Sequence, residues 1–503
     1  MSRFLVPVAV LLELVALCLA NPWLSALSGV LFLLYFLSVL GSLQAYSRAL
    51  FVLSVVMVGG LGLAGKLGAD ELMRAASNAA FYAAFLGSLG MMQCLVRRLE
   101  VLRRIHDVLL GGRPGLLYPK YAVVSCGIAS VLSFGVMNLL CGTLADTLRE
   151  RGITGASRLL WLRSVLISTL RGFALVPLVA PTSVAVAIIT REVPTLSWSG
   201  LLPYGIGSAV LLILVGWFLE HKRFRLVSSE REALEHWPDG SGQLALLVTI
   251  IFVAMALLVQ FSGLKVSVAA MLTVPVVTFL YMWWHDRSLP GVARESVDNM
   301  LGMSNEMSIF AGSAGLGVAL VSVIPADALA GLASGELGVF LLAAGGMLMM
   351  PMLSAIGIIP ITVLSVQAGL MPQLVAEGVD PLPIAAALVI GFSLAMMLSP
   401  FGPAVMLLSR FGQVSRWVVA FAWNGLFVLL SIPLLLIMLW GLFVVAPRSV
   451  AAAGVYDAGD GLAIVVGTDL PGDLLQRGIP QGAGGNVRRD GDLRPLPERV
   501  LGG

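Results

Sequence analysis

Long apolar runs alternate with short polar loops along almost the whole chain. From Phe4 to the region of Phe443, runs of about 18 or more apolar residues recur, and each is long enough to cross a bilayer as a helix. We predict about eleven spans, near residues 4–20, 23–43, 49–66, 75–96, 164–190, 200–219, 242–262, 265–284, 305–325, 382–409 and 416–445. The pattern therefore predicts an all-α integral membrane protein.

Two further apolar stretches, 119–145 and 338–370, are too long and too interrupted to be single helices. The centre of the first reads SFGVMN (residues 133–138), and the centre of the second reads SAIGIIP (residues 354–360). Non-helical backbone at membrane depth is tolerated only where protein or a water-filled cavity covers it. We predict that both stretches are re-entrant hairpins, each of which enters and leaves the membrane on one side.

The distribution of basic residues predicts the orientation. With these spans, the loops on one side carry twenty Lys and Arg residues, whereas the loops on the other side carry four: Lys66, Arg74, Arg191 and Lys265. The richly basic side is expected to be cytoplasmic, which places the N-terminus in the cytoplasm and the C-terminus outside the inner membrane of a bacterium. The bias depends on the two hairpins, because a single span in either place would exchange the sides of the loops that follow.

Three matches between the two halves of the chain indicate an internal duplication. Two pairs lie 222 positions apart and a third match lies at 227: Gly135 with Gly357, Pro181 with Pro403, and SNAAFYAAFLGSLG from Ser77 with SNEMSIFAGSAGLG from Ser304. Five crossings separate the hairpins, and this odd number makes the repeats inverted. Inverted repeats are typical of alternating-access transporters.

The predicted organisation has five parts. An extra, retained N-terminal span (1–22) precedes a first inverted repeat (23–219), a cytoplasmic linker (220–241) and a second inverted repeat (242–445). The extracytoplasmic tail (446–503) is rich in Gly, Pro, Asp and Arg without periodicity, so we expect it to be disordered.

Composition agrees with this organisation. Hydrophobic residues make up 58% of the chain, charged residues 12%, and the mean hydropathy is +0.96, whereas a soluble domain has about 25% charged residues. The lipid bilayer is the expected surrounding, and the net charge of +3 gives no reason to expect a nucleic-acid partner. The four cysteines and four histidines have no metal-ligand spacing, and no nucleophile–base pair appears, so we expect neither a metal site nor an enzyme.

Helices broken at membrane depth are the candidate binding sites, because a break exposes amide ends that favour anions and carbonyl ends that favour cations. The sequence predicts breaks near 180–183 and 399–403. The candidate substrate-binding and ion-binding residues come from these breaks and from the hairpin centres: Ser133, Gly135, Asn138, Ala180, Pro181, Thr182, Ser183, Ser354, Gly357, Ser399, Gly402 and Pro403. The alternative is that Pro and Gly only kink long helices, which is common in membranes.

Charged residues in or near the spans are further candidates. Arg171 precedes the first break and is expected either to clamp an anion or to reach the nearby cytoplasmic face. Asn305 and Glu306 begin a span and are candidates for proton coupling, with an interfacial position as the alternative. Glu13 lies in the extra first span, outside the repeats, where a functional role is less expected.

The segments VPLVAPTSVAVAI from Val176, LSPFGPAVMLL from Leu398 and FAGSAGLGVAL from Phe310 resemble the ion transporter superfamily, in particular the divalent anion:sodium symporters of the dicarboxylate and citrate type. The resemblance extends to about Leu442. It implies two inverted repeats, hairpins that grip a substrate carboxylate, Na⁺ as a coupling ion with no other cofactor, and a homodimer. The hairpins of this chain lack the Ser-Asn-Thr signature of that family, and its broken helices lack the usual Asn.

These observations predict a secondary active transporter that moves a small organic anion, carboxylate-like, by alternating access, coupled to a sodium or proton gradient. An exporter or antiporter of the same superfamily with a different substrate is the near alternative. An integral-membrane enzyme acting on lipid-linked substrates is a further alternative, although it requires a cluster of His, Asp, Glu or Arg at one membrane face.

Overall fold

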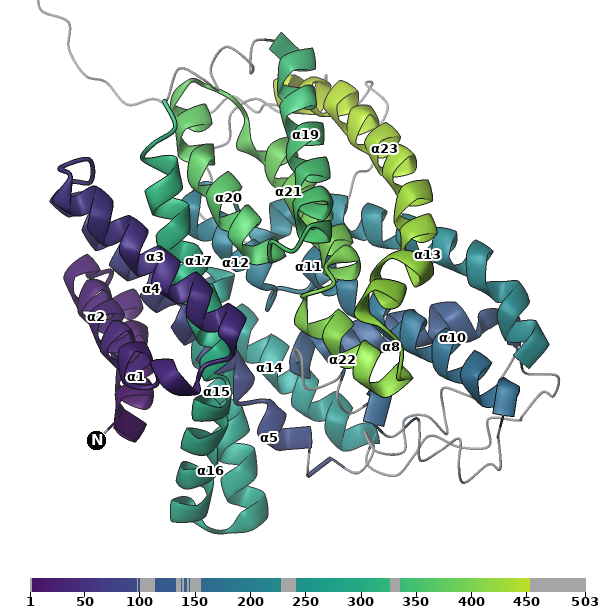
Figure 1. Ribbon diagram of the computed structural model, residues 1–503, viewed down its shortest axis with the longest axis horizontal. Coiled ribbons are helices and arrows are strands. Elements are labelled where there is room, and N and C mark those ends of the chain that lie inside the picture. Colours follow the sequence, from purple (N-terminus) through teal and green to yellow (C-terminus); the bar gives the residue numbers. More distant parts are fainter. Residues whose placement is uncertain are drawn as a thin grey trace, which may run out of the picture. The chain divides into compact units, whose positions relative to one another are not determined.

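The structure is a computed structural model, and it describes residues 2–96, 98–99, 114–132, 137, 140–142, 144, 155–227, 241–325 and 335–452. Within these ranges every regular element is a helix (Figure 1). The α-helices are α1 (Ser2–Cys18), α2 (Pro22–Ser38), α3 (Ala45–Leu63), α4 (Ala69–Gly90), α5 (Gln93–Val96), α8 (Leu117–Leu132), α10 (Gly155–Ala174), α11 (Val176–Val179), α12 (Val184–Glu192), α13 (Trp198–Val227), α14 (Ser241–Ser262), α15 (Val266–Asp286), α16 (Leu289–Gly302), α17 (Ser304–Val321), α19 (Gly335–Ala355), α20 (Pro360–Ala376), α21 (Pro381–Leu398), α22 (Pro403–Gly412) and α23 (Gly425–Ala452).

The surface of these helices is apolar, as a bilayer requires. Seven helices or broken helices in the described part are long and apolar enough to cross a membrane, and three shorter apolar helices accompany them. In the most apolar 18-residue stretch of α14, only 17% is buried inside the protein. Large apolar side chains such as Phe4, Trp23 and Phe261 are exposed. Exposed apolar side chains on helices of this length are stable in lipid, so the chain is an all-α membrane protein.

Each of the eleven predicted spans lies on a helix or on a broken helix of the structure. The helix that the apolar pattern missed is α16, which carries Arg294, Glu295 and Asp298 and was expected to be a loop. Its buried residues Val292, Ser296 and Met300 recur every four positions, so the helix packs with one face only.

Arg98 holds α16 against the end of α15. Its guanidinium donates to Asp286 at the end of α15 and to Glu295 on α16, at 3.1 Å for Nε to Asp286 Oδ1 and 3.1 Å for Nη1 to Glu295 Oε1. These bonds, the one to Asp286 first, raise the pKa of Arg98 above its usual value. A polar helix is thereby fixed outside the apolar spans.

Two long helical segments, Arg158–Glu192 and Pro381–Gly412, are each interrupted by four residues of non-helical backbone. The first segment contains α10, α11 and α12, and the second contains α21 and α22. The first break (Ala180, Pro181, Thr182 and Ser183) separates α11 from α12, and the second break (Ser399, Pro400, Phe401 and Gly402) separates α21 from α22. The residues at the edges of both breaks are extended, with ψ between 106° and 140°. Proline explains this geometry at Ala180, Ser399 and Gly402, each of which precedes a proline, because proline lacks an amide donor and forces the residue before it away from the helical region.

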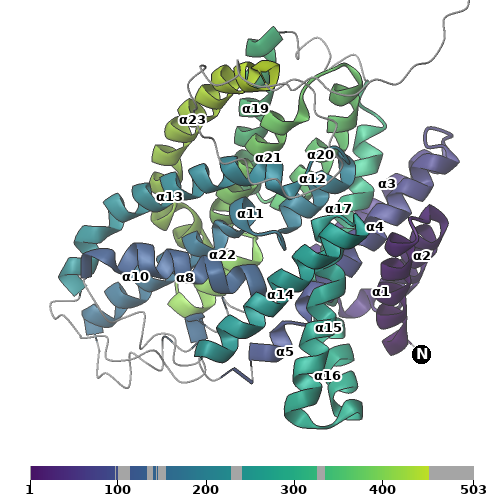
Figure 2. The ribbon, with the colours of Figure 1, turned by 180° about the vertical axis from the view of Figure 1, so that it is seen from behind.

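The second predicted hairpin is a pair of helices, α19 and α20, joined by a turn at residues 356–359. In both ribbon views α19 and α20 lie in the upper part of the bundle, and α22 lies below them (Figures 1 and 2). Gly357 has a φ of +113°, a conformation that L side chains rarely adopt, and a Cβ there would lie 3.1 Å from the Phe401 ring. The turn therefore packs directly on the second break.

The first predicted hairpin is described only in part. Its first helix is α8, but Ser133, Gly135 and Asn138 lie outside the described residues. Within the described part, α8 touches the first break, because the Thr182 hydroxyl donates to the carbonyl of Ser130.

The two broken helices share a sequence as well as a shape. Residues 172–191 (GFALVPLVAPTSVAVAIITR) and 391–410 (GFSLAMMLSPFGPAVMLLSR) are identical at seven of twenty positions without a gap, at an offset of 219. Pro181 therefore corresponds to Pro400, whereas Pro403, its expected partner, is the first residue of α22. Sequence and backbone assign the same register.

Close packing follows the same register. A Cβ on Gly172 would lie 2.4 Å from the Ala122 carbonyl of α8, and a Cβ on Gly391 would lie 2.6 Å from the Met347 carbonyl of α19. Since Gly172 and Gly391 are also 219 positions apart, each broken helix approaches the first helix of its hairpin at the same place.

The two broken helices also touch each other. The Ser393 hydroxyl donates to the carbonyl of Ala174 at 2.5 Å, and these two residues are again 219 positions apart. Each break begins six residues beyond this contact, which is about 9 Å along a helix. The breaks thus flank the point at which the two helices meet.

Candidate functional site

Buried hydroxyls without partners mark both breaks. Ser183 is 2% exposed and Ser399 is 0% exposed, and neither hydroxyl has a hydrogen-bond partner among the described residues. A buried unpaired hydroxyl costs roughly 1–3 kcal/mol, so such groups need a water, an ion or a ligand. The sequence had placed both serines among the candidate binding residues.

The turn of the second hairpin adds a third such hydroxyl. Ser354 is fully buried near the end of α19, and its hydroxyl also lacks a partner in the described part of the chain. Gly391 packs on Met347 and Phe401 on Gly357, so α19 and α21 run side by side in one register. This register places Ser354 level with Ser399.

The helix ends at the breaks add electrostatic groups. The N-cap residues of α12 and α22 are Ser183 and Gly402, and neither makes a side-chain cap bond. The first amides of both half-helices are therefore left to other partners, and a helix N-terminus favours an anion by about 0.3–1 kcal/mol at the surface. Gly402 suits this place because even a Cβ would lie 3.2 Å from Ser399, and Pro403 begins α22 at a position that needs no amide.

The remaining residues of the first break have structural contacts. Ala180 and Pro181 are buried, and Ala180 closes α11 through the bond from its amide to the carbonyl of Val176. The Thr182 hydroxyl already donates a hydrogen bond to the Ser130 carbonyl of α8. Ser183 is thus the side chain that this break leaves open.

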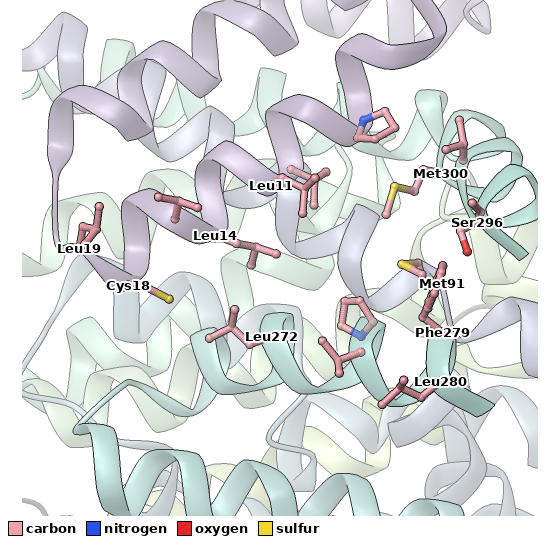
Figure 3. Close-up of a pocket in the computed structure, with 17 residues that line it drawn as sticks. Leu11, Leu14, Cys18, Leu19, Met91, Leu272, Phe279, Leu280, Ser296 and Met300 are labelled. Atoms are coloured by element: carbon pink, nitrogen blue, oxygen red, sulfur yellow. The ribbon is translucent and has the colours of Figure 1, made fainter. Parts of the chain in front are cut away.

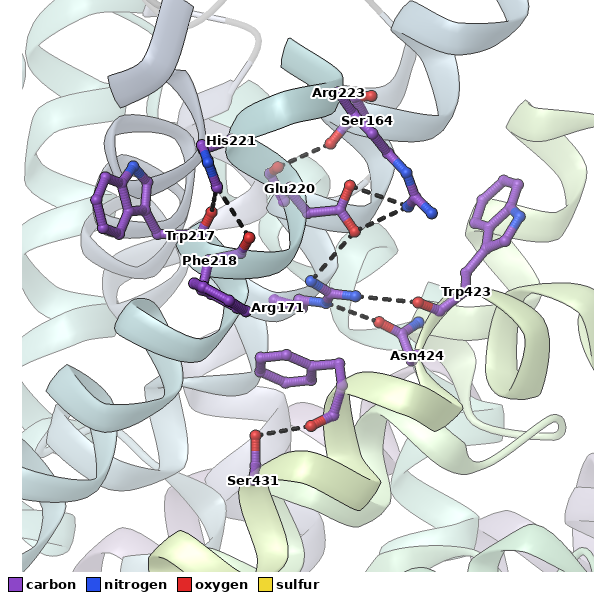
Figure 4. Close-up of polar contacts among 12 residues, drawn as sticks. Ser164, Arg171, Trp217, Phe218, Glu220, His221, Arg223, Trp423, Asn424 and Ser431 are labelled. Atoms are coloured by element: carbon purple, nitrogen blue, oxygen red, sulfur yellow. Dashed lines mark hydrogen bonds and ion pairs between the residues drawn. The ribbon is translucent and has the colours of Figure 1, made fainter. Parts of the chain in front are cut away.

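Arg171 is paired within the protein (Figure 4). It is 2% exposed, Nε donates to Asn424 Oδ1 at 3.0 Å, Nη2 donates to the Trp423 carbonyl at 3.0 Å, and Nη1 lies 3.6 Å from Glu220 Oε1. The guanidinium also stacks on Phe427 at 4.1 Å. The sequence left Arg171 with two alternatives, an anion clamp or a side chain that reaches the cytoplasmic face, and in the structure its charge is paired with Glu220.

Asn305 and Glu306 lie away from the breaks, at the start of α17. Asn305 accepts a hydrogen bond from the Gln44 amide, and Glu306 has one buried oxygen without a partner among the described residues. Glu306 also lines a polar cavity of about 750 Å³, shared with Arg294 and Asp298 of α16. Among the candidates that the structure describes, no hydrogen bond or ion pair joins Asn305 or Glu306 to the residues of the breaks.

A polar network that the sequence did not predict surrounds the end of α12. Asn78 donates to Glu192 Oε1 at 2.7 Å, and Arg74 pairs with the same carboxylate. Lys265 donates to the Thr190 carbonyl. Four basic residues were expected on the outer side, and three of them, Arg74, Arg191 and Lys265, meet here. Arg191 lies in the last turn of α12, next to Glu192. Their scarcity in the outer loops was the available signal.

Glu192 also lines a polar cavity of about 320 Å³. Helices α4, α17 and α20 complete this cavity, and its other charged residues in the described part are Lys66, Glu71 and Arg74. The end of the half-helix that follows the first break is therefore a polar surface.

A second large cavity is apolar and is not a candidate for a polar ligand. It measures about 730 Å³ and lies between α1, α15 and α16 (Figure 3). Leu11, Leu14, Leu272 and Phe279 are among its lining residues. A groove of this kind on a membrane protein faces hydrocarbon.

The chain is similar to known proteins in its fold but matches none in the comparisons of sequence. No family model matches the chain, and no curated protein matches it. Among solved structures, the chain is similar to the one described as "Crystal structure of the Alcanivorax borkumensis YdaH transporter reveals an unusual topology", with a TM-score of 0.48 and 15% sequence identity. The likeness covers 82% of this chain and 98% of that chain. At this degree of likeness, function has to be inferred from the geometry of the two breaks.

Proposed function

We propose that the protein is a secondary active transporter that carries a small organic anion by alternating access between two inverted repeats. The anion would bind between the two breaks and the hairpin turns, and a sodium or proton gradient would drive the cycle. The expected location is the inner membrane of a bacterium, with the N-terminus in the cytoplasm.

The observation that carries this proposal is the set of three buried hydroxyls without partners. Ser183, Ser354 and Ser399 lie at the two breaks and at the one described hairpin turn, and the breaks share backbone and sequence. Proline and glycine that only kinked a helix would leave no reason for an unpaired buried hydroxyl in each break, at the end of the first (Ser183) and at the start of the second (Ser399). Two broken helices that meet at a crossing, each with polar groups at its break, are typical of the binding sites of alternating-access transporters.

An anion suits the groups present. The uncapped N-termini of α12 and α22 and the three hydroxyls are all donors, and donors stabilise a carboxylate in a low-dielectric site. Since Arg171 is paired with Glu220, these donors and a coupling cation would supply the compensation that a buried carboxylate needs.

Uptake by proteoliposomes tests the proposal, with radiolabelled succinate and citrate as probes and an imposed sodium or pH gradient. Ser183→Ala and Ser399→Ala should each lower uptake at least about tenfold, because each removes a hydrogen bond to a charged ligand. Ser168→Ala is the matched control, since Ser168 is fully buried on α10 but its hydroxyl already donates to the Ser164 carbonyl.

Two results would count against the proposal. Wild-type uptake by both variants would show that the orphaned hydroxyls bind nothing that is transported. No uptake of either anion under either gradient would reject a carboxylate substrate.

A further inference from the structure

A buried carboxylate lies at one end of a chain of hydrogen bonds that leads to α12. Glu13 sits in the middle of α1 and is 0% exposed, and both its oxygens lie within 2.9 Å of the Ser25 hydroxyl on α2. Ser25 Oγ is 2.7 Å from Ser77 Oγ on α4, and Arg191 Nη2 donates to Ser77 at 2.6 Å. The chain thus crosses four helices.

Arg191 ties α12 to α4. Besides its bond to Ser77, Nε donates to Asn78 Oδ1 at 3.3 Å, and the guanidinium lies 4.9 Å from the Phe81 ring. We call the bonds of Arg191 to Ser77 and Asn78 the α12 latch. Arg410, the equivalent residue at an offset of 219, is exposed and forms no ion pair among the described residues. Within the part of the chain that the structure describes, no hydrogen bond or ion pair of Arg410 corresponds to the latch.

The direction of the hydrogen bonds depends on the charge of Glu13. When Glu13 is ionised, Arg191 donates to Ser77, Ser77 donates to Ser25, and Ser25 donates to the carboxylate, so every donor has an acceptor. When Glu13 carries a proton, it donates to Ser25 and Ser25 to Ser77. Ser77 can still accept from both Ser25 and Arg191, because a hydroxyl oxygen has two lone pairs, but without the charge of the carboxylate it is less polarised and the bond that holds Arg191 is weaker.

We propose that Glu13 is a proton-binding site whose occupancy controls the α12 latch. The ionised carboxylate holds α12 against α4, and protonation releases the half-helix that follows the first break. This inference rests on the proposed transport function and makes the proton the coupling ion.

The groups around Glu13 favour a proton over a metal ion. Arg191 is the charged side chain that acts on it, from α12. The nearest side chains from α2 and α4 are the hydroxyls of Ser25 and Ser77, and the ion pair of Arg3 with Asp298 of α16 lies at the exposed end of α1. The positive charge of Arg191, which is bonded to Ser77, disfavours a metal cation beside it. A proton that binds to the Glu13 carboxylate neutralises it and requires no further ligands.

Infrared difference spectroscopy of the protein in lipid membranes tests the site. A protonated carboxyl band should grow as the pH is lowered, and Glu13→Gln should lose one component of it. Glu336→Gln, which changes an exposed carboxylate on α19, is the control and should keep this component. Glu13→Asp should keep a band at a shifted frequency, which shows that loss of the band reports the carboxyl and not misfolding.

Hydrogen–deuterium exchange of peptide 184–192 tests the latch. At alkaline pH, Glu13→Gln should exchange about tenfold or more faster than wild type, because it lacks the charge that polarises the chain. The two rates should approach each other at acid pH, where both side chains are neutral.

An unchanged band in Glu13→Gln, or equal exchange of the two proteins at every pH, overturns the inference. Neither measurement uses a transported substrate. Sodium-driven anion uptake without these signatures would therefore remove the proton site and leave the proposed function intact. The signatures without any anion uptake would leave the proton site and remove the proposed function.

Discussion

Arg171 and Glu220 should behave as a structural ion pair, and their substitutions should differ in cost. Their side chains are 3% and 2% exposed. Glu220→Gln leaves Arg171 buried without a carboxylate, which should lower the free energy of unfolding by about 3–5 kcal/mol. Arg171→Gln should cost less, about 2–3 kcal/mol, because Glu220 keeps Arg223 at 3.1 Å. Chemical unfolding in mixed micelles measures both values.

A double substitution and an exposed control complete the test. Arg171→Leu combined with Glu220→Leu should destabilise less than Glu220→Gln alone, because no unpaired charge remains. Arg223→Gln should cost below about 1 kcal/mol, since that side chain is 42% exposed. Wild-type stability of Arg171→Gln together with lost anion uptake would refute the structural role and restore the anion clamp.

Two further predictions concern helix packing and topology. Gly172→Ala should lower the free energy of unfolding by about 1–3 kcal/mol because its Cβ would meet the backbone of α8, whereas Gly127→Ala on α8, with nothing within 4 Å, should be neutral or stabilising; equal effects on thermal stability would contradict the close packing. Single cysteines at Leu337 and Glu377, in a background without native cysteines, should both react with an impermeant maleimide from outside, because α19 and α20 are expected to form a re-entrant hairpin. Labelling from opposite faces would make the pair ordinary spans.

The spans and the breaks could be predicted because their causes are local. A run of about 18 apolar residues is long enough to cross a bilayer as a helix, so the spans could be located from the sequence of each run alone. The breaks depend on the backbone limits of proline, which act on the neighbouring residue whatever surrounds it. Ser183 and Ser399 followed from the breaks for the same reason.

The register of the repeat was within reach of the sequence. Residues 172–191 match residues 391–410 without a gap and pair Pro181 with Pro400, whereas the offset of 222 that joins Gly135 to Gly357 pairs Pro181 with Pro403. The helix α16 was missed for a different reason, since its polar residues outweigh a single buried face.

The sequence by itself determined that this chain is a membrane protein, which segments are long and apolar enough to span the bilayer, and where two of them break. These features depend on the length of apolar runs and on proline geometry, which are properties of short segments. Only the tertiary structure decided which charges are paired. Arg171 meets Glu220 and Asn424, and Glu13 reaches Arg191 through two hydroxyls, across sequence separations that no local pattern encodes. The free energy of a buried charge depends on partners brought close by packing, and so its role could be read only after the helices were assembled.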